Sequence, residues 1–322
     1  MRILLAPMEG VVDHHMRRTL NSVTTESSST KAIDSCVTEF IRVTDHLLPT
    51  RVFMRSCPEL WENHSFPVHV QLLGSNPEAL ALNARKVAKL GAPAVDLNFG
   101  CPAKTVNKNR GGACLLDDTA LLEKIVSTVR NSVPPQTPVS VKIRLGYENR
   151  KSYLRNATAI ERAGANELVV HARSKADGYR PPAYWHYIKD IQRELSIPVI
   201  ANGEIWSVSD YEKCRDLSGC EDIMLGRGLL AQPDLAFAIK AKISGQQYTP
   251  LAWANIAKYL YQFYLDTCHA YPAKYRGNRV KQWLHYLQRN YTQAEQLFTD
   301  IKQTRDGDVL DRRLKQELHS GF

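Results

Sequence analysis

Eight short apolar segments, separated by longer amphipathic ones, constrain the fold of this chain more than any other feature. Each is rich in β-branched or aliphatic residues, as parallel strands buried on both faces must be. The predicted strands are 2–8, 36–43, 68–74, 94–100, 139–146, 167–173, 197–204 and 222–228. Amphipathic helices are predicted between most of them, at 77–90, 117–132, 153–164, 185–195, 208–217 and 233–242.

Eight strand–helix repeats predict a closed (β/α)₈ TIM barrel of the α/β class rather than a doubly wound sheet. A doubly wound nucleotide domain has five or six strands and a G-x-G-x-x-G after one of them, and that fingerprint is absent from the sequence. Two stretches give weak signals. Residues 44–67 lack a clear helical pattern, and the Ser/Thr-rich segment 22–32 is predicted to be a loop.

After residue 243 the strand pattern stops. The linker-like segment SGQQYTPLAW is followed by four predicted helices at about 251–268, 278–289, 292–303 and 308–318. An apolar stripe at helical spacing, which is typical of a core, is formed by Val280, Trp283, Leu284, Leu287 and Tyr291. The expected domains are therefore a catalytic barrel over 1–242 and an all-α C-terminal helical bundle over 243–322.

The chain carries a net charge of +9, and its distribution indicates where a polyanion would bind. Residues 243–289 contain six Lys/Arg and one acid, Asp266. Residues 290–322 carry five basic and six acidic side chains. The basic density thus lies early in the C-terminal part, which favours that part as a nucleic-acid-binding surface.

Several classes of protein are disfavoured by composition. No run of 18 apolar residues exists, and the first ten residues lack a signal-peptide layout, so we expect a cytoplasmic protein without a membrane partner. Seven cysteines are scattered without C-x-x-C spacing, which argues against a disulfide framework and a zinc site. We expect no bound metal, and we expect the protein to be a monomer.

In a barrel, function lies where the strands end. Two predicted strands end in glycine turns, Asn202-Gly203-Glu204 and Gly226-Arg227-Gly228. Backbone N–H groups approach a phosphate closely where no Cβ intervenes, although either turn alone could serve only to reverse the chain. The two together, with Arg227 between glycines, favour a phosphate site.

Lys142 lies in a strand that should otherwise be apolar. It could be a Schiff-base nucleophile, an ion-pair partner, or a cation facing a cofactor. A lysine beside a flavin would stabilise the anionic reduced ring. Gln71 could recognise the flavin pyrimidine edge, because an amide supplies both donor and acceptor. Together these positions favour a flavin lying across the barrel.

Cys101 is the most specific catalytic candidate, because it lies between Gly100 and Pro102 where the fourth strand ends. A thiol with an ordinary pKa is protonated at neutral pH and can donate a proton, although a buried structural cysteine is the alternative. For Cys114 the structural role is favoured. His171 could face a ligand or be a satisfied core histidine.

Several motifs, in order through residues 1–242, give the chain a family resemblance. They are LLAPMEGV, VQLLG, DLNFGCPAKTV followed by RGGACLL, VKIRLG, ELVVHAR, IPVIANGEI and IMLGRG. Together these resemble the tRNA-dihydrouridine synthases, and DLNFGCP with VKIRLG and NGEI is specific to that family. CVTEFIRVTDHLLP, the CPEL at 57–60 and RVKQWLHYL resemble the bacterial C-type, which acts on uridine 16 in the D-loop.

The resemblance implies a flavin- and NADPH-dependent reduction of tRNA uridine to 5,6-dihydrouridine. Hydride would pass from reduced flavin mononucleotide (FMN) to C6, and Cys101 would protonate C5. The implied FMN-binding residues are Pro7, Met8, Glu9, Gln71, Lys142, Asn202, Gly203, Glu204, Gly226 and Arg227, with His171 nearby. The implied uracil-binding residues are Asn98, Arg144 and Tyr179, and the implied tRNA contacts are Arg42, Arg279 and Lys281.

Three alternatives share parts of this pattern. A flavin barrel acting on a small pyrimidine metabolite would use the same strand ends but would not show salt-dependent tRNA binding. A non-flavin aldolase or isomerase would use Lys142 as a Schiff-base lysine and would be colourless. A non-catalytic tRNA-binding protein would leave the polar strand ends unexplained.

Overall fold

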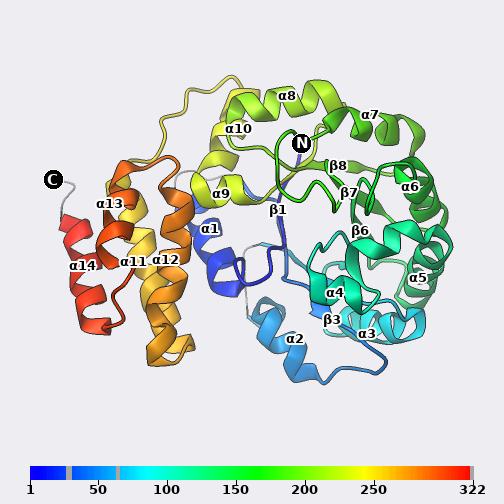
Figure 1. Cartoon of the computed structure of the whole chain (residues 1–322), viewed down its shortest axis with the longest axis horizontal. Coiled ribbons are helices and arrows are strands. Elements are labelled where there is room, and N and C mark those ends of the chain that lie inside the picture. The colour runs from blue at the N-terminus through cyan, green and yellow to red at the C-terminus, as the bar shows by residue number, and fades with distance from the viewer. Residues whose placement is uncertain (27–30, 63–65, 320–322) are drawn as a thin grey trace. The chain divides into compact units, whose positions relative to one another are not determined.

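The computed structural model describes residues 1–26, 31–62 and 66–319. These divide into two compact units. Unit 1 comprises residues 1–9, 34–205 and 209–226, and unit 2 comprises residues 10–33, 206–208 and 227–322. Each unit is described by itself below, and Figure 1 gives the element labels.

Unit 1 is a closed barrel of parallel strands, as the sequence predicts. Its strands are β1 (Ile3–Leu5), β2 (Ser35–Val37), β3 (Ile41–Arg42), β4 (Val68–Leu73), β5 (Val95–Phe99), β6 (Val139–Arg144), β7 (Glu167–His171), β8 (Val199–Asn202) and β9 (Ile223–Leu225). β1 pairs with both β2 and β9, and β2 pairs with β4, which closes the ring. β2 and β3 both pair with β4 and occupy one strand position, so the barrel has eight positions.

Apolar side chains pack together in the barrel, where Leu4, Val37, Val169, Ile200 and Met224 form one buried cluster with Ala6. The second strand position is interrupted between Val37 and Ile41. There the buried hydroxyl of Thr38 accepts a hydrogen bond from the backbone N–H of Gln71 at 3.0 Å. The predicted strand 36–43 is therefore present in two parts.

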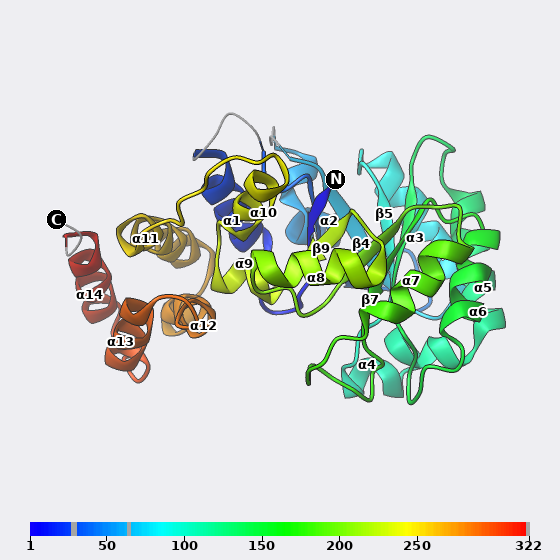
Figure 2. The ribbon, with the colours of Figure 1, turned by 90° about the horizontal axis from the view of Figure 1, so that it is seen from above.

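Helices surround the strands (Figure 2). They are α2 (Thr50–Ser56), α3 (Pro77–Lys89), α4 (Lys104–Lys108), α5 (Thr119–Ser132), α6 (Tyr153–Arg162), α7 (Trp185–Glu194) and α8 (Val208–Ser218), with 3₁₀ turns η1 (Pro58–Leu60) and η2 (Gly112–Asp117). α3 packs against α5, and α5 against α6. The side chains of Asn76 and Asp118 accept from the backbone N–H groups of Ala79 and Leu121 and cap α3 and α5.

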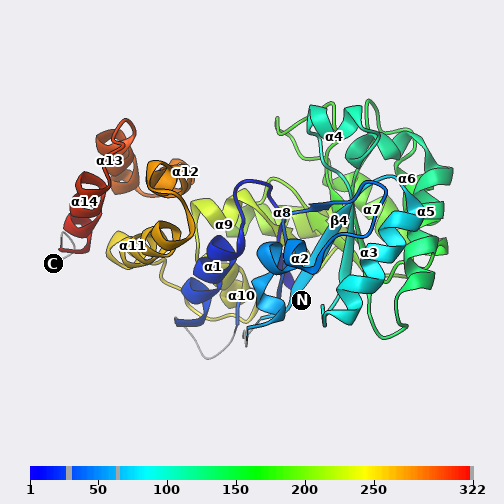
Figure 3. The same cartoon turned by 90° about the horizontal axis from the view of Figure 1, so that it is seen from below.

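Unit 2 is helical. It contains α1 (His14–Glu26), α9 (Arg227–Ala231), α10 (Leu235–Ile243), α11 (Trp253–Ala270), η3 (Ala273–Tyr275), α12 (Arg276–Leu287), α13 (Thr292–Ile301) and α14 (Gly307–His319). α12 packs against α11, α13 and α9, and α1 packs against α11 (Figure 3). The predicted apolar stripe is buried except for Tyr291, which follows α12 and is half-buried. The Trp283 indole N–H donates to the Leu230 carbonyl at 3.1 Å.

The loop predicted at 22–32 is wrong for residues 22–26, which form the last turns of α1. Residues 27–30 lie outside the described part. The helix is polar and rich in Ser and Thr, so its propensity is low, but Met16, Leu20 and Val23 recur at helical spacing and are fully or almost fully buried. Tertiary burial of this face outweighs local propensity.

The compact units do not divide the chain at residue 242, because α1, α9 and α10 belong with the C-terminal helices. The expectation that residues 1–242 carry catalysis and residues 243–322 bind tRNA concerns activity rather than compactness, and it stays a prediction. In the described ranges, no helix combines the length and apolarity needed to cross a membrane. Within the same residues, no cluster of three or more His, Cys, Asp or Glu side chains could hold a metal ion.

Candidate active site

The carboxyl ends of the unit 1 strands bring together most of the residues that the sequence singled out. Strand register places Asn98 beside Lys142, Arg144 beside His171, and His171 beside Asn202. The Lys142 ammonium donates to Asn202 Oδ1 at 3.0 Å, and Asn202 Nδ2 donates to the Met224 carbonyl at 2.8 Å. Four neighbouring strands, β6 to β9, thus share one polar edge.

Lys142 is half-buried at this edge. Burial, together with the charge of Arg144, lowers the pKa of Lys142 to about 8, while Asp96 acts in the opposite direction. The amine is therefore mostly protonated at neutral pH and carries a cation into a largely apolar strand wall. A cation facing a cofactor requires this charged form, but burial beside another cation also activates Schiff-base lysines, so the pKa is compatible with both roles.

Gln71 and Asn98 form a buried amide pair on β4 and β5. Asn98 Nδ2 donates to Gln71 Oε1 at 2.7 Å, and the two residues are 8% and 0% exposed, respectively. Asn98 Oδ1 in turn accepts from the backbone N–H groups of Gly100 at 3.0 Å and Cys101 at 2.9 Å. The amide pair therefore determines the turn that carries the predicted catalytic thiol.

Cys101 is 8% exposed and packs with Leu73, Val106, Phe40 and Ala103. Burial raises the pKa of the Cys101 thiol, with the carboxylate of Glu9 acting in the same direction. The group is consequently a protonated thiol at neutral pH. A raised pKa suits a proton donor and does not suit a thiolate nucleophile.

Arg144 links the end of β6 to the loop that follows β7. Its Nε donates to the Gly100 carbonyl at 2.9 Å, and its Nη1 donates to the carbonyls of Ser174 at 3.0 Å and Gly178 at 2.9 Å. The guanidinium also lies 5.2 Å from the ring centroid of Tyr179, which is 54% exposed. The Tyr179 ring lies 6.0 Å from that of His171.

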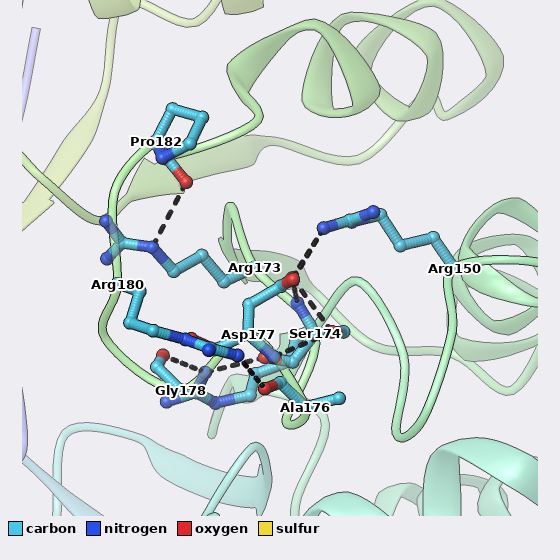
Figure 4. A network of polar contacts seen from close by, with 9 residues as sticks. Arg150, Arg173, Ser174, Ala176, Asp177, Gly178, Arg180 and Pro182 are labelled. Atoms are coloured by element: carbon cyan, nitrogen blue, oxygen red, sulfur yellow. Dashed lines mark hydrogen bonds and ion pairs between the residues drawn. The ribbon is translucent and has the colours of Figure 1, made fainter.

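A second arginine, Arg150, also holds this loop (Figure 4). Arg150 Nη2 donates to both carboxylate oxygens of Asp177 at 2.7 Å, and Asp177 Oδ2 accepts from the backbone N–H and hydroxyl of Ser174. The Arg150 guanidinium stacks 3.8 Å from the Tyr184 ring centroid. The exposed Tyr179 is thus presented by a loop with fixed ends.

The two predicted glycine turns differ in what they require of glycine. Gly203 has φ of +112°, and a Cβ there would lie 2.6 Å from Cδ2 of His171. A Cβ at Gly226 would contact Met8 Sδ at 3.4 Å, an ordinary distance. Only Gly203 therefore depends on having no side chain. Glu204, at φ +60°, is paired with the fully buried Arg173 at 2.5 Å.

Pro7, Met8 and Glu9 follow β1, with Pro7 and Met8 half-buried and Glu9 exposed. Three other residues at this strand edge match the chemistry of FMN. Gln71 is an amide with donor and acceptor positions, Lys142 is a cation, and Gly203 allows a close approach to the backbone. Arg227 belongs to unit 2, begins α9, and lies 4.9 Å from the ring centroid of Trp206.

The three predicted tRNA contacts have different surroundings. Arg42 on β3 is exposed. Within unit 2, Arg279 is only 12% exposed and forms an ion pair with Asp13 at 3.1 Å. Lys281 donates to the Thr304 carbonyl at 2.5 Å. The last two therefore have structural partners, which charge counting does not reveal.

Sequence reasoning missed Asp96, Arg150 and Asp177. Asp96 is 1% exposed, and burial raises its pKa to about 7 although hydrogen bonds from Ser140 and Gln71 act in the opposite direction. Its signal was present, since an acid in a strand buried on both faces is as anomalous as Lys142. Arg150 and Asp177 lie in predicted loops, where nothing in the sequence marks them.

Comparison with known proteins gives consistent matches. The family described as "Dihydrouridine synthase (Dus)" matches residues 4–319. A protein of Pseudomonas putida named "tRNA-dihydrouridine(16) synthase" is 46% identical over 98% of this chain and 97% of its own length. One of Shewanella oneidensis with the same name is 44% identical over 99% of each. A solved 2-naphthoyl-CoA reductase complex shares the fold alone, with a TM-score of 0.53 and 12% identity over 76% of this chain and 50% of its own.

Proposed function

The chain belongs to the dihydrouridine synthase family, and from that premise we propose that it reduces uridine 16 in the D-loop of tRNA to 5,6-dihydrouridine, using FMN and NADPH in the cytoplasm. The observation that carries the proposal is the buried thiol of Cys101, held by Asn98 on a turn at the same strand edge as Lys142 and Arg144. Position 16 is supported by relatives of that name that match almost the full chain.

FMN, when bound, would supply the hydride that reduces uracil C6, after its own reduction by NADPH. We assign its binding to Pro7, Met8, Glu9, Gln71, Lys142, Asn202, Gly203, Glu204, Gly226 and Arg227, with His171 nearby. The cation of Lys142 favours negative charge at the edge of the bound ring. Gln71 keeps one N–H and one lone pair beyond its bonds to Asp96 and Asn98, but its side chain is fully buried, so its assignment to FMN rests on the family resemblance.

The target base must leave the tRNA fold to reach the strand ends, where Asn98, Arg144 and Tyr179 would hold it. Tyr179 offers an exposed ring for stacking. Cys101 then donates its proton to C5 while C6 receives the hydride, and the resulting thiolate is reprotonated from water. Arg42 is exposed to contact the tRNA backbone. Lys281 would use the ammonium donors that remain beyond its bond to Thr304. Arg279 would act through its charge alone, because its terminal N–H groups are engaged and its Nε is buried.

The decisive experiment mixes purified protein, FMN, NADPH and unmodified tRNA, and maps dihydrouridine by position. Dihydrouridine at position 16 is expected. Cys101→Ala should retain FMN and tRNA binding and lose most of the product. A product at another position would refute the site assignment, and full turnover by Cys101→Ala would refute the proton-donor role.

A further inference from the structure

A buried carboxylate lies behind the site wall and is not used by the chemistry above. Asp96 on β5 stands in register between Gln71 on β4 and Ser140 on β6. Its Oδ2 accepts from Gln71 Nε2 at 2.6 Å, and its Oδ1 accepts from the Ser140 hydroxyl at 2.6 Å. With 1% exposure, the carboxyl satisfies its hydrogen bonds through these two neighbours rather than through bulk water.

The hydrogen bonds continue from Gln71 to the catalytic turn without a break. Gln71 Oε1 accepts from Asn98 Nδ2, and Asn98 Oδ1 accepts from the backbone N–H of Cys101. Four groups from Asp96 to Cys101 are therefore linked in series, and the intermediate amides are buried.

The direction of this series is set at the Asp96 end. The Asp96 oxygen that faces Gln71 accepts a hydrogen bond, so Gln71 turns its Nε2 toward Asp96 and its Oε1 toward Asn98. Rotating the Gln71 amide by half a turn would place two acceptors against each other at Asp96 and two donors against each other at Asn98. The backbone N–H of Cys101 sets the same order from the other end.

We propose that Asp96 is a positioning residue that, through Gln71 and Asn98, fixes both the turn carrying Cys101 and the orientation of the buried Gln71 amide that is assigned to FMN. The FMN half of the proposal rests on the proposed function. The Cys101 half does not, because the thiol can be probed without flavin.

The two bonds to the carboxylate offer a matched control. The Ser140 bond has the same length as the Gln71 bond and also ends on Asp96, but it does not lie on the path to Cys101. Ser140→Ala therefore removes a comparable buried hydrogen bond without interrupting the series. A purely structural role for Asp96 predicts that Ser140→Ala and the Asp96 variants behave alike.

The test uses the full-length variants Asp96→Ala, Asp96→Val, Asp96→Asn and Ser140→Ala. Asp96→Ala and Asp96→Val are two side-chain truncations that both remove the carboxyl group, so misfolding of one leaves the test intact. FMN affinity is measured by quenching of flavin fluorescence. The rate of Cys101 alkylation by iodoacetamide is measured by peptide mass mapping in flavin-free protein, and thermal denaturation confirms folding.

We expect either truncation to weaken FMN binding and to accelerate Cys101 alkylation, each by about tenfold, the size of one lost hydrogen bond. Asp96→Asn should restore both toward wild type, because its oxygen can accept from Gln71 while its amide donates to Ser140. Ser140→Ala should change both less than about twofold.

Wild-type FMN affinity and alkylation in a folded truncation would overturn the proposal, as would equal changes in Ser140→Ala. Failure of the wild-type protein to bind FMN would instead refute the proposed function, and the alkylation rates would still decide the role of Asp96.

Discussion

Arg279 and Asp13 form an ion pair of 3.1 Å in which each side chain is only 12% exposed. The same guanidinium donates to the backbone carbonyls of Gly10 at 2.5 Å and Val11 at 2.7 Å. The hydroxyl of Tyr271 donates to Asp13 Oδ2 at 2.9 Å. Arg279 therefore anchors the segment that leads into α1, in addition to any contact with RNA.

Arg279→Ala should lower the free energy of unfolding by about 3 kcal/mol, because it leaves Asp13 buried without its cation. Urea denaturation of the flavin-free protein measures the change. The exposed Arg289, on the same basic segment, provides the control. Its guanidinium lies 4.2 Å from the ring centroid of Trp206, so Arg289→Ala should lower the free energy of unfolding by about 1 kcal/mol or less. Equal stability of Arg279→Ala and wild type would show that the pair contributes nothing.

The Arg279 effect should also depend on pH. Burial would raise the pKa of Asp13, but the Arg279 charge, the Met16 backbone N–H and the Tyr271 hydroxyl together lower it below 3.8. A depressed folded pKa means that the stabilisation is present above the unfolded value and is lost as pH falls through the folded one. The stability gap between wild type and Arg279→Ala should therefore be full at pH 6 and shrink below pH 3.8. A gap that stays constant would contradict this assignment.

Charge patterning indicated a basic segment but did not show which of its cations are engaged in contacts within the protein. Arg279 and Lys281 lie on the same segment as Arg289, yet the first is largely buried and the second donates to a backbone carbonyl. Side-chain geometry depends on tertiary contacts with residues distant in sequence, such as Asp13 and Thr304. Composition carries no record of those contacts.

Lys142→Met should be more stable than wild type at neutral pH, although it should lose activity. The pKa of Lys142 falls from 10.5 to about 8 through burial and Arg144, so the charged amine destabilises the fold by about 1–3 kcal/mol at pH 7. Because the unfolded state binds more protons between these values, stability rises with pH across that window and the advantage of Lys142→Met vanishes above about pH 10.5. Denaturation at pH 7 and pH 10 measures both values. A variant less stable at pH 7 would refute the desolvation argument.

Most of the barrel was predictable because parallel strands buried on both faces leave continuous apolar runs, and all eight strand positions were found. α1 was missed because its apolar face, Met16, Leu20 and Val23, is diluted by Ser and Thr, and only packing makes the helix stable. The site was predictable where polar residues interrupt apolar strands, as at Gln71 and Lys142. Asp96 also interrupts an apolar strand. Its hydrogen bonds to Gln71 and Ser140, however, depend on which residues lie opposite it on the neighbouring strands, and the sequence alone does not give that register.

Asp177→Ala should loosen the loop that presents Tyr179, because it removes the bidentate bond to Arg150 and the bonds to Ser174. We expect the KM for tRNA to rise about fivefold, with FMN affinity unchanged. Chymotrypsin cleavage after Tyr179 should accelerate in parallel. Lys175→Ala is the control for proteolysis, since the ion pair between Lys175 and Glu148 holds the same loop but lies away from the cleaved bond. Unchanged cleavage in Asp177→Ala would show that Arg144 alone fixes the loop.

Arg2→Met should separate stability from activity at the opposite end of the barrel. Arg2 donates through its backbone N–H and Nε to Asp222, each at 2.7 Å, and through Nη1 to Glu167 at 2.9 Å. These residues lie at or just before the first residues of β1, β9 and β7, whereas the site lies at the strand ends. The Arg2 side chain is 43% exposed, so we expect a loss of about 1 kcal/mol or less, with turnover and FMN affinity unchanged. Denaturation measures the stability of Arg2→Met, and steady-state assays of the same preparation measure its turnover. Lost turnover with wild-type stability would place part of the catalytic machinery at the amino ends of the strands.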